Sequence, residues 1–133
     1  MHKGLLKVAS VMGLLSVALG AFAAHSLKGL ISDHAVTTFE TAVRYQFYHA
    51  LALLITGILY RDFKTKTMLW AGRFFIAGII LFSGSLYLLT FIQAAVLPGY
   101  NWVGAITPFG GLCFITGWIL LFISFFRKDQ SVV

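Results

Sequence analysis

Residues 5–24 of the chain read LLKVASVMGLLSVALGAFAA, an apolar run in which Lys7 is the only charged residue. A helix that crosses the hydrocarbon core of a bilayer needs about 20 consecutive apolar residues. Because Lys7 lies close to the start of the run, its side chain can reach the headgroup region. This segment predicts a transmembrane helix, and the rest of the chain is interpreted from it.

Three further apolar runs of similar length follow, at about residues 41–60, 68–92 and 108–126. Each is long enough to cross a bilayer as a helix. The sequence therefore predicts an all-α fold, in which residues 1–133 form a single domain: an integral membrane four-helix bundle with spans at about 5–24, 41–60, 68–92 and 108–126.

Two helix starts carry recognisable capping residues. Ser32 and Asp33 offer N-cap oxygens well ahead of the second run, so that helix is expected to begin outside the bilayer with an external amphipathic extension. Thr107 followed by Pro108 is expected to cap the fourth helix, because proline at the first helical position lacks only an N–H that the helix does not use.

The composition excludes several classes of protein. With 59% hydrophobic and 11% charged residues, the chain has too little charge for a water-soluble globule of its length. The formal charge of +6 does not indicate nucleic-acid binding, because the basic residues flank apolar runs instead of forming a patch with exposed aromatic rings. Cys113 is the only cysteine, which rules out an internal disulfide and a cysteine-based zinc site.

The distribution of lysine and arginine predicts the orientation. Eight of the ten basic residues fall on the side that carries both termini, and the positive-inside rule places that side in the cytoplasm. The expected location is the cell (inner) membrane, multi-pass, with both termini cytoplasmic. The eight residues are Lys3, Lys7, Arg61, Lys64, Lys66, Arg73, Arg127 and Lys128, and the other two are Lys28 and Arg44.

An alternative for the first run remains open. The basic residues ahead of it and the small-residue pattern Ala21-Phe22-Ala23 also resemble a cleavable secretory signal. The run is long for such a signal, and its small residues suit a helix-packing face better. Small residues recur along one face of the first helix and again in the fourth, where they allow close approach in lipid: Ala9, Gly13, Ser16, Gly20, Ala24, Gly110, Cys113 and Gly117.

Polar residues gather toward one end of the predicted bundle. Glu40 and Arg44 are four residues apart and share a helix face, so they are expected to form an ion pair at the membrane boundary. Tyr45 and His49 have the same spacing and are expected to share a hydrogen bond. The simpler interpretation of both pairs is structural, and the sharper one is a ligand or proton site.

His49 needs a hydrogen-bond partner because it lies within an apolar span. Ser83, Ser85 and Tyr87 on the third helix are the expected partners. A histidine held by an interhelical hydrogen bond is the simpler interpretation, and a proton relay is the alternative. His25 together with His49 also raises the possibility of a bis-histidine haem site.

Four segments resemble a known family. They occur in order along all four predicted spans: GAFAAH at 20–25, YQFYHALALL at 45–54, FSGSLY at 82–87 and ITPFGG at 106–111. As a set they resemble the YgdD-type family of small inner-membrane proteins, whose eukaryotic relatives are called transmembrane protein 256-like. The resemblance implies that the first span is retained, and it implies no activity, because the family is a domain of unknown function.

No nucleophile elbow, P-loop or zinc-binding signature occurs, so no catalytic residue, metal or cofactor is predicted. The expected role is a non-enzymatic structural or assembly protein. Its expected partners are the lipid bilayer and a homo-oligomer or membrane-protein partner, with no nucleic acid. Two alternatives are a small-solute or proton-linked carrier that uses the polar cluster, and a haem- or quinone-binding redox protein. The candidate polar cluster is His25, Glu40, Arg44, Tyr45, His49, Ser83, Ser85 and Tyr87.

Overall fold

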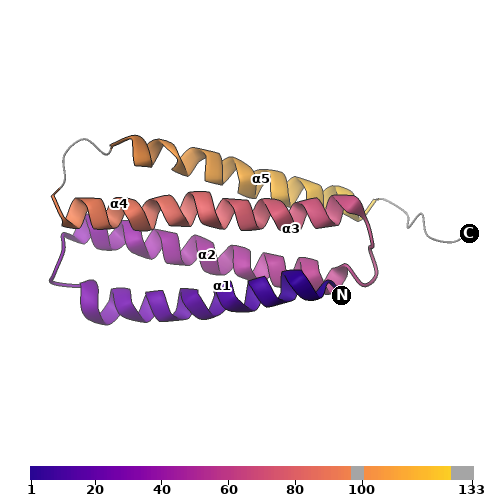
Figure 1. Ribbon diagram of the computed structural model, residues 1–133, viewed down its shortest axis with the longest axis horizontal. Helices are drawn as coiled ribbons and strands as arrows, with labels where there is room; N and C mark the ends of the chain where they lie inside the picture. The colour runs from indigo at the N-terminus through magenta and orange to yellow at the C-terminus, as the bar shows by residue number, and fades with distance from the viewer. Residues whose placement is uncertain (97–100, 127–133) are drawn as a thin grey trace, which may run out of the picture.

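Four helical runs form the protein, whose computed structural model describes residues 1–96 and 101–126. Each run is long and apolar enough to cross a membrane: Lys3–Leu27, Asp33–Leu59, Lys66–Ala94 and Trp102–Ser124. They pack side by side with no strand in the described part of the chain (Figure 1). The predicted all-α, four-helix fold class is therefore confirmed. Arg127 and Lys128, which contribute to the predicted orientation, lie outside the described residues.

The first two runs are joined by a tight turn. α1 spans Lys3–Phe22 and continues as a π-helical turn, η1, at Ala23–Leu27. Gly29 in the following turn has a φ of 86°, a left-handed conformation that glycine adopts without steric cost. α2 spans Asp33–Leu59, and the Ser32 hydroxyl caps it by accepting a hydrogen bond from the Ala35 N–H at 3.3 Å.

The third run is one continuous helix with a local irregularity. α3 (Lys66–Gly78) and α4 (Gly84–Ala94) are connected through a π-helical turn, η2, at Ile79–Ser83. The Thr65 hydroxyl caps α3 by accepting from the Met68 N–H at 3.1 Å. A π turn widens the helix locally and changes the direction in which the following side chains point. The hydropathy pattern of this span contained no signal for it.

The start of the last helix differs from the prediction. A short 3₁₀ helix, η3 (Asn101–Ala105), leads into α5, which spans Thr107–Ser124 with proline in its first turn, as expected. The prediction that Thr107 is the N-cap is wrong, because Ile106 occupies that position. The Thr107 hydroxyl lies 2.8 Å from the Ser85 hydroxyl on α4 and bonds to that neighbouring helix instead of capping its own.

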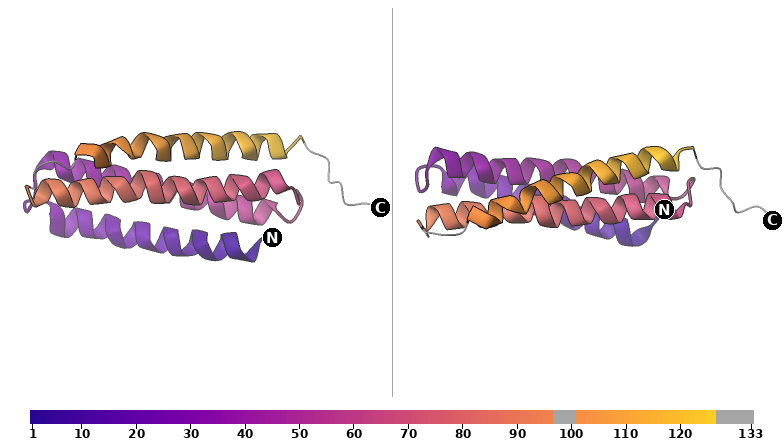
Figure 2. Two further views of the ribbon diagram at one scale, coloured as in Figure 1. Left: turned by 45° about the horizontal axis from the view of Figure 1, so that its top comes forward. Right: turned by 90° about the horizontal axis from the view of Figure 1, so that it is seen from above.

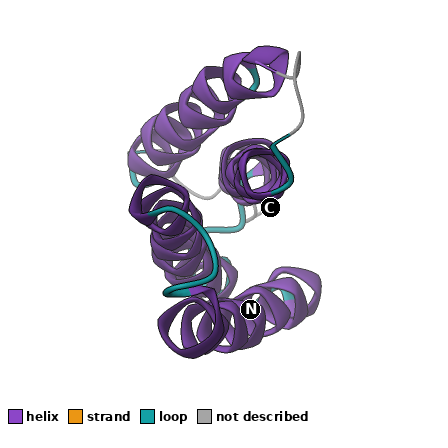
Figure 3. Ribbon diagram, turned by 90° about the vertical axis from the view of Figure 1, so that its left-hand side faces the viewer, coloured by secondary structure: helices purple, strands orange, loops and turns teal. Residues whose placement is uncertain are grey.

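The helices are ordered so that α1 and α5 lie at opposite edges, with α2 and the α3–α4 helix between them (Figures 1 and 2). The view along the long axis of the bundle shows that the helices are inclined to one another (Figure 3). The turn between α1 and α2 lies at one end, which we call the Lys28 end. The N-terminus and the turn between α2 and α3 lie at the other, which we call the Lys7 end.

Buried apolar side chains fill the space between the central helices. Leu53 of α2, Met68 of α3 and Phe75 of α3 are fully buried in the main cluster. A second cluster around Phe39 and Leu27 lies toward the Lys28 end. Because lipid removes the hydrophobic drive between helices, close packing and interhelical hydrogen bonds stabilise such a bundle. The positions of the polar side chains therefore matter for the candidate site.

Candidate functional site

His49 of α2 is buried, and both of its ring nitrogens have partners. Nδ1 lies 2.8 Å from the backbone carbonyl oxygen of Tyr45, and Nε2 accepts a hydrogen bond from the indole Nε1 of Trp118 at 3.3 Å. A carbonyl oxygen only accepts, so Nδ1 carries the proton and Nε2 is the acceptor. The ring of Phe114 stacks on the imidazole with centroids 3.4 Å apart. His49 is therefore a neutral, fully bonded side chain that connects α2 to α5.

The expected bond between the Tyr45 phenol and His49 is replaced by a backbone bond. The Tyr45 carbonyl accepts the Nδ1 proton, while the Tyr45 ring stacks at 6.2 Å from the imidazole centroid and packs against Phe82 at 4.6 Å. The side chain of Tyr45 thus takes part in an aromatic cluster, and its hydroxyl does not bond to His49.

The three expected partners of His49 on the third helical run bond elsewhere. Ser83, Ser85 and Tyr87 each form a short hydrogen bond that does not include the imidazole. Their partners are the Ala42 carbonyl at 2.8 Å for Ser83, the Thr107 hydroxyl at 2.8 Å for Ser85, and the Gln46 side-chain oxygen at 2.9 Å for Tyr87. Ser83 and Tyr87 thus connect the third helical run to α2, Ser85 connects it to α5, and none of the three bonds to His49.

Gln46 joins three helices and was absent from the sequence-based candidates. Its Nε2 donates to the Met12 carbonyl of α1 at 3.0 Å, and its Oε1 accepts from the Tyr87 hydroxyl of α4. Gln46 is buried, with 4% of its surface exposed. A glutamine in the middle of an apolar run is a signal for interhelical bonding that could have identified it. Trp118 gave only the weaker signal that an indole N–H within an apolar span needs an acceptor.

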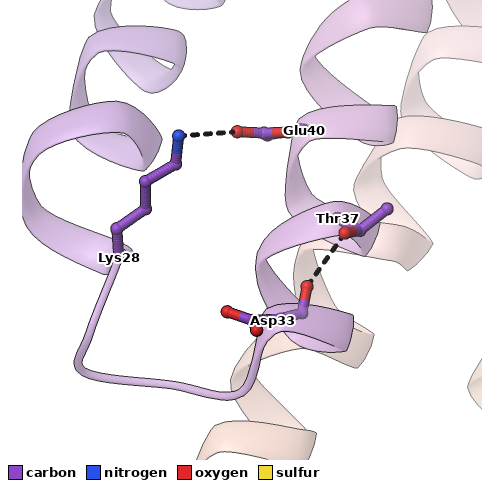
Figure 4. Close-up of polar contacts among 4 residues, drawn as sticks. All are labelled: Lys28, Asp33, Thr37 and Glu40. Atoms are coloured by element: carbon purple, nitrogen blue, oxygen red, sulfur yellow. Dashed lines mark hydrogen bonds and ion pairs between the residues drawn. The ribbon is translucent and has the colours of Figure 1, made fainter.

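The charged residues near the Lys28 end are arranged differently from the expectation. Glu40 forms an ion pair with Lys28 at 4.0 Å (Figure 4), and the expected pair between Glu40 and Arg44 is absent from the described residues. Both members of the observed pair are solvent-accessible in the bundle, so it contributes little to stability. Figure 4 also shows Thr37 donating to the carbonyl of Asp33 in the first turn of α2, at 2.9 Å.

His25 does not face His49. Gly20 of α1 lies against Val43 of α2, which sets the two helices in register. At about 1.5 Å per residue, His25 lies about 8 Å from that level toward the Lys28 end, and His49 lies about 9 Å from it toward the Lys7 end. Axial ligands of one haem approach a single iron from its two faces. The exposed position of His25 in η1 therefore does not complete a bis-histidine site with His49.

The small residues proposed for helix packing fall into two groups. On α5, a side-chain carbon at Gly117 would lie 2.7 Å from the Phe75 ring, and one at Gly110 would lie 2.6 Å from the Phe82 Cα, so both glycines allow close approach within the chain. Cys113 between them is half-buried. On α1, Ala9 and Ser16 are buried and Gly20 is half-buried, but Ala24 is exposed and a carbon at Gly13 would meet nothing within 4 Å.

Gly13 lies in an open groove between α1 and α2. One section of this groove has a volume of about 460 Å³ and is lined by Gly13, Leu14 and Val17 of α1 with Phe47 and Leu51 of α2, among others. A second section of about 250 Å³ includes Arg44 and Tyr48. Val17 and Phe47 line both sections, so we treat them as one feature and call it the α1–α2 groove.

The buried polar atoms of the described residues all have hydrogen-bond partners. In residues 1–96 and 101–126, no three His, Cys, Asp or Glu side chains lie together as they would around a metal ion. The candidate polar cluster thus consists of bonds that connect helices, together with charged and aromatic side chains near the Lys28 end. Such an arrangement of bonded polar side chains holds helices in register.

Comparison with known proteins finds one family and several relatives. The family described as "Protein of unknown function (DUF423)" matches residues 19–111. A UPF0382 membrane protein of Staphylococcus aureus (strain bovine RF122 / ET3-1) is 48% identical over 86% of this chain and 88% of its own length. The UPF0382 membrane protein YwdK of Bacillus subtilis (strain 168) is 41% identical over 86% of this chain and 89% of its own. No solved structure matches.

Proposed function

The chain belongs to the DUF423 family of small membrane proteins, and from this premise we propose that it is a non-enzymatic helical module that assembles with another chain in the bacterial cell membrane. The family description assigns no activity, and the relatives are named only as membrane proteins. The proposal also keeps the expected orientation, with both termini in the cytoplasm, and the narrower resemblance to the YgdD-type family.

One observation carries the proposal. The polar side chains that an enzyme or a carrier would use are the ones that connect the helices: His49 with Trp118, Gln46 with Tyr87, and Ser85 with Thr107. A carrier requires a polar cavity that reaches the bilayer midplane. His49, Ser83, Ser85 and Tyr87 line neither section of the α1–α2 groove. The geometry therefore supports a scaffold more than a transport pathway.

The edge positions of α1 and α5 support an assembly role. Each edge helix packs on the bundle through one side, and its other side carries large apolar side chains. Leu14 of α1 is 70% exposed, and Phe122 of α5 is 62% exposed. In a membrane these faces contact lipid or the helices of another chain, and close packing decides which of the two is preferred.

In-membrane cross-linking tests the proposal. Single cysteines are placed in a Cys113→Ser background at three exposed positions: Leu14→Cys on α1, Ile80→Cys on η2 and Ile119→Cys on α5. Assembly predicts a discrete cross-linked species from one of these faces, with the other two serving as controls. Equal, diffuse cross-linking from all three positions, or none from any, together with a monomer in nanodiscs, would contradict the assembly role.

A further inference from the structure

The α1–α2 groove is open because the chain places no side chain in it. A carbon added at Gly13 would meet nothing within 4 Å, whereas carbons at Gly110 and Gly117 on α5 would clash with aromatic residues of the bundle. Gly13 therefore contributes no close packing inside the chain. The groove lining is almost entirely apolar along the first section, so an apolar occupant fits it.

Arg44 lines the second section of the groove and gives this section a positive charge. Among the residues that the structure describes, no carboxylate lies within ion-pair distance of Arg44, and Glu40 pairs with Lys28 instead. Side chains on a helix point toward its N-terminus, so the guanidinium reaches toward the Lys28 end. Because no carboxylate of the described residues neutralises Arg44, an anionic group at the membrane boundary suits it as a partner.

The groove runs from the level of Arg44 past the middle of the bundle. Gly20 is level with Val43, so Arg44 is level with about Leu19 of α1. From that level to Ala9, at the far end of the groove, is about 15 Å at about 1.5 Å per residue. The hydrocarbon core is about 30 Å thick, so one leaflet accounts for about 15 Å. The middle of the predicted span 5–24 lies between Leu14 and Leu15, about 7 Å from the level of Arg44. An acyl chain whose phosphate lies above Arg44 would therefore reach the groove at Gly13 and Leu14 near the midplane.

We propose that the α1–α2 groove binds one acyl chain of an anionic phospholipid, whose phosphate is held by Arg44 in the leaflet at the Lys28 end. A guanidinium binds phosphate oxygens through two parallel N–H donors, which suits it to this headgroup. Tyr48 lines the same section and is exposed, so its hydroxyl is a second donor for the phosphate. This site goes beyond the assembly role and does not depend on it.

A second copy of the chain is a weaker occupant. Two copies in one membrane that meet through this groove by a two-fold axis would present the same surface to each other. Their Arg44 side chains would then lie at the same depth. The groove lining contains no carboxylate to neutralise them. Like charges at close range in a low dielectric repel, so the positive rim favours a phosphate over another copy.

Native mass spectrometry of the purified full-length chain tests the proposal. The probes are phosphatidylglycerol and phosphatidylcholine with identical acyl chains, and the expected result is one preferred phosphatidylglycerol per chain. Arg44→Gln should lower its affinity about tenfold, since a charge-assisted bond is lost. Arg73→Gln is the matched control, because Arg73 lies on α3 over the Trp70 ring and outside the groove. Arg44→Lys should retain part of the preference.

A groove-filling variant tests the acyl-chain part separately. Gly13→Leu should abolish the preferred adduct, and Gly111→Leu on α5, where an added carbon also meets nothing within 4 Å, should not. Circular dichroism in the same detergent checks that each variant is folded. If Gly13→Leu does not fold, the result for Arg44→Gln decides the proposal. The proposal is overturned if the two lipids bind equally, or if Arg44→Gln and Arg73→Gln lower the affinity for phosphatidylglycerol equally. It is also overturned if Gly13→Leu is folded and forms fewer dimers but binds phosphatidylglycerol normally.

Discussion

The indole N–H of Trp118 on α5 donates a hydrogen bond to Nε2 of His49 on α2 across 3.3 Å. These residues are 69 positions apart in the chain, and their bond connects an edge helix to the centre of the bundle. Because Nδ1 of His49 is already bonded to the Tyr45 carbonyl, Trp118 is the group that completes the hydrogen bonding of the imidazole.

Trp118→Phe is expected to lower the free energy of unfolding by about 1 kcal/mol, because Nε2 of His49 loses its donor. Combined with His49→Phe in a double-mutant cycle, the coupling energy should be about 0.6 kcal/mol and no more than about 1.7 kcal/mol, the average and the maximum found for interhelical hydrogen bonds in membranes. Reversible unfolding in mixed detergent micelles measures both values. Trp70→Phe on α3 is the control and should change stability less. A coupling energy indistinguishable from zero would show that the bond contributes nothing.

Gly110→Ala should destabilise the protein by about 1–3 kcal/mol, as overpacking does in a close-packed interior. The added carbon would lie against the backbone of Phe82 in η2, and backbone cannot move aside as a flexible side chain can. Gly111→Ala is a neighbouring control in open space, and it should be neutral or slightly stabilising through helix propensity. Thermal unfolding of the two variants in one detergent compares them. Equal midpoints would contradict the close approach of α5 to η2.

Much of the fold could be predicted from the sequence because lipid imposes simple rules on it. Hydropathy located four helical runs, and Ser32 indicated where α2 begins. Thr107 was assigned wrongly because a hydroxyl at a helix start has two uses, capping its own helix or bonding a neighbour, and only the position of Ser85 decides between them. The π turn at Ile79–Ser83 carries no hydropathy signal.

The candidate site was harder to predict because its contacts depend on helix rotation. The i, i+4 spacing correctly placed Tyr45 and His49 on one face, but it could not tell a phenol from a backbone carbonyl as the partner. Which helix contacts His49 depends on how the four helices are arranged in space. The sequence alone does not indicate that α5 lies beside His49. Lys28 lies outside α2, so the spacing of residues along α2 predicted Arg44, and not Lys28, as the ion-pair partner of Glu40.

Tyr87→Phe removes the donor to Gln46 Oε1 and leaves that buried oxygen without its partner, so a loss of about 1 kcal/mol is expected. Gln46→Leu should also destabilise the bundle, because the Tyr87 hydroxyl loses its partner and the bond from α2 to the Met12 carbonyl of α1 is lost. The double variant should lose less than the sum of the two, since both partners of the shorter bond are then apolar. Unfolding in mixed micelles measures all three. Simple additivity would show that the two side chains do not interact.

The two ends of the bundle should lie on opposite sides of the membrane, with the Lys7 end inside. Arg61, Lys64 and Lys66 lie in or beside the α2–α3 turn, and basic residues next to spans are retained in the cytoplasm. In a Cys113→Ser background, an impermeant maleimide should label Leu30→Cys in intact cells, because Leu30 is 79% exposed in the α1–α2 turn. Asp62→Cys in the α2–α3 turn should be labelled only after the membrane is opened. If Asp62→Cys reacts first, the orientation is inverted, and the Arg44 groove then faces the inner leaflet, where a phosphate would still complete it.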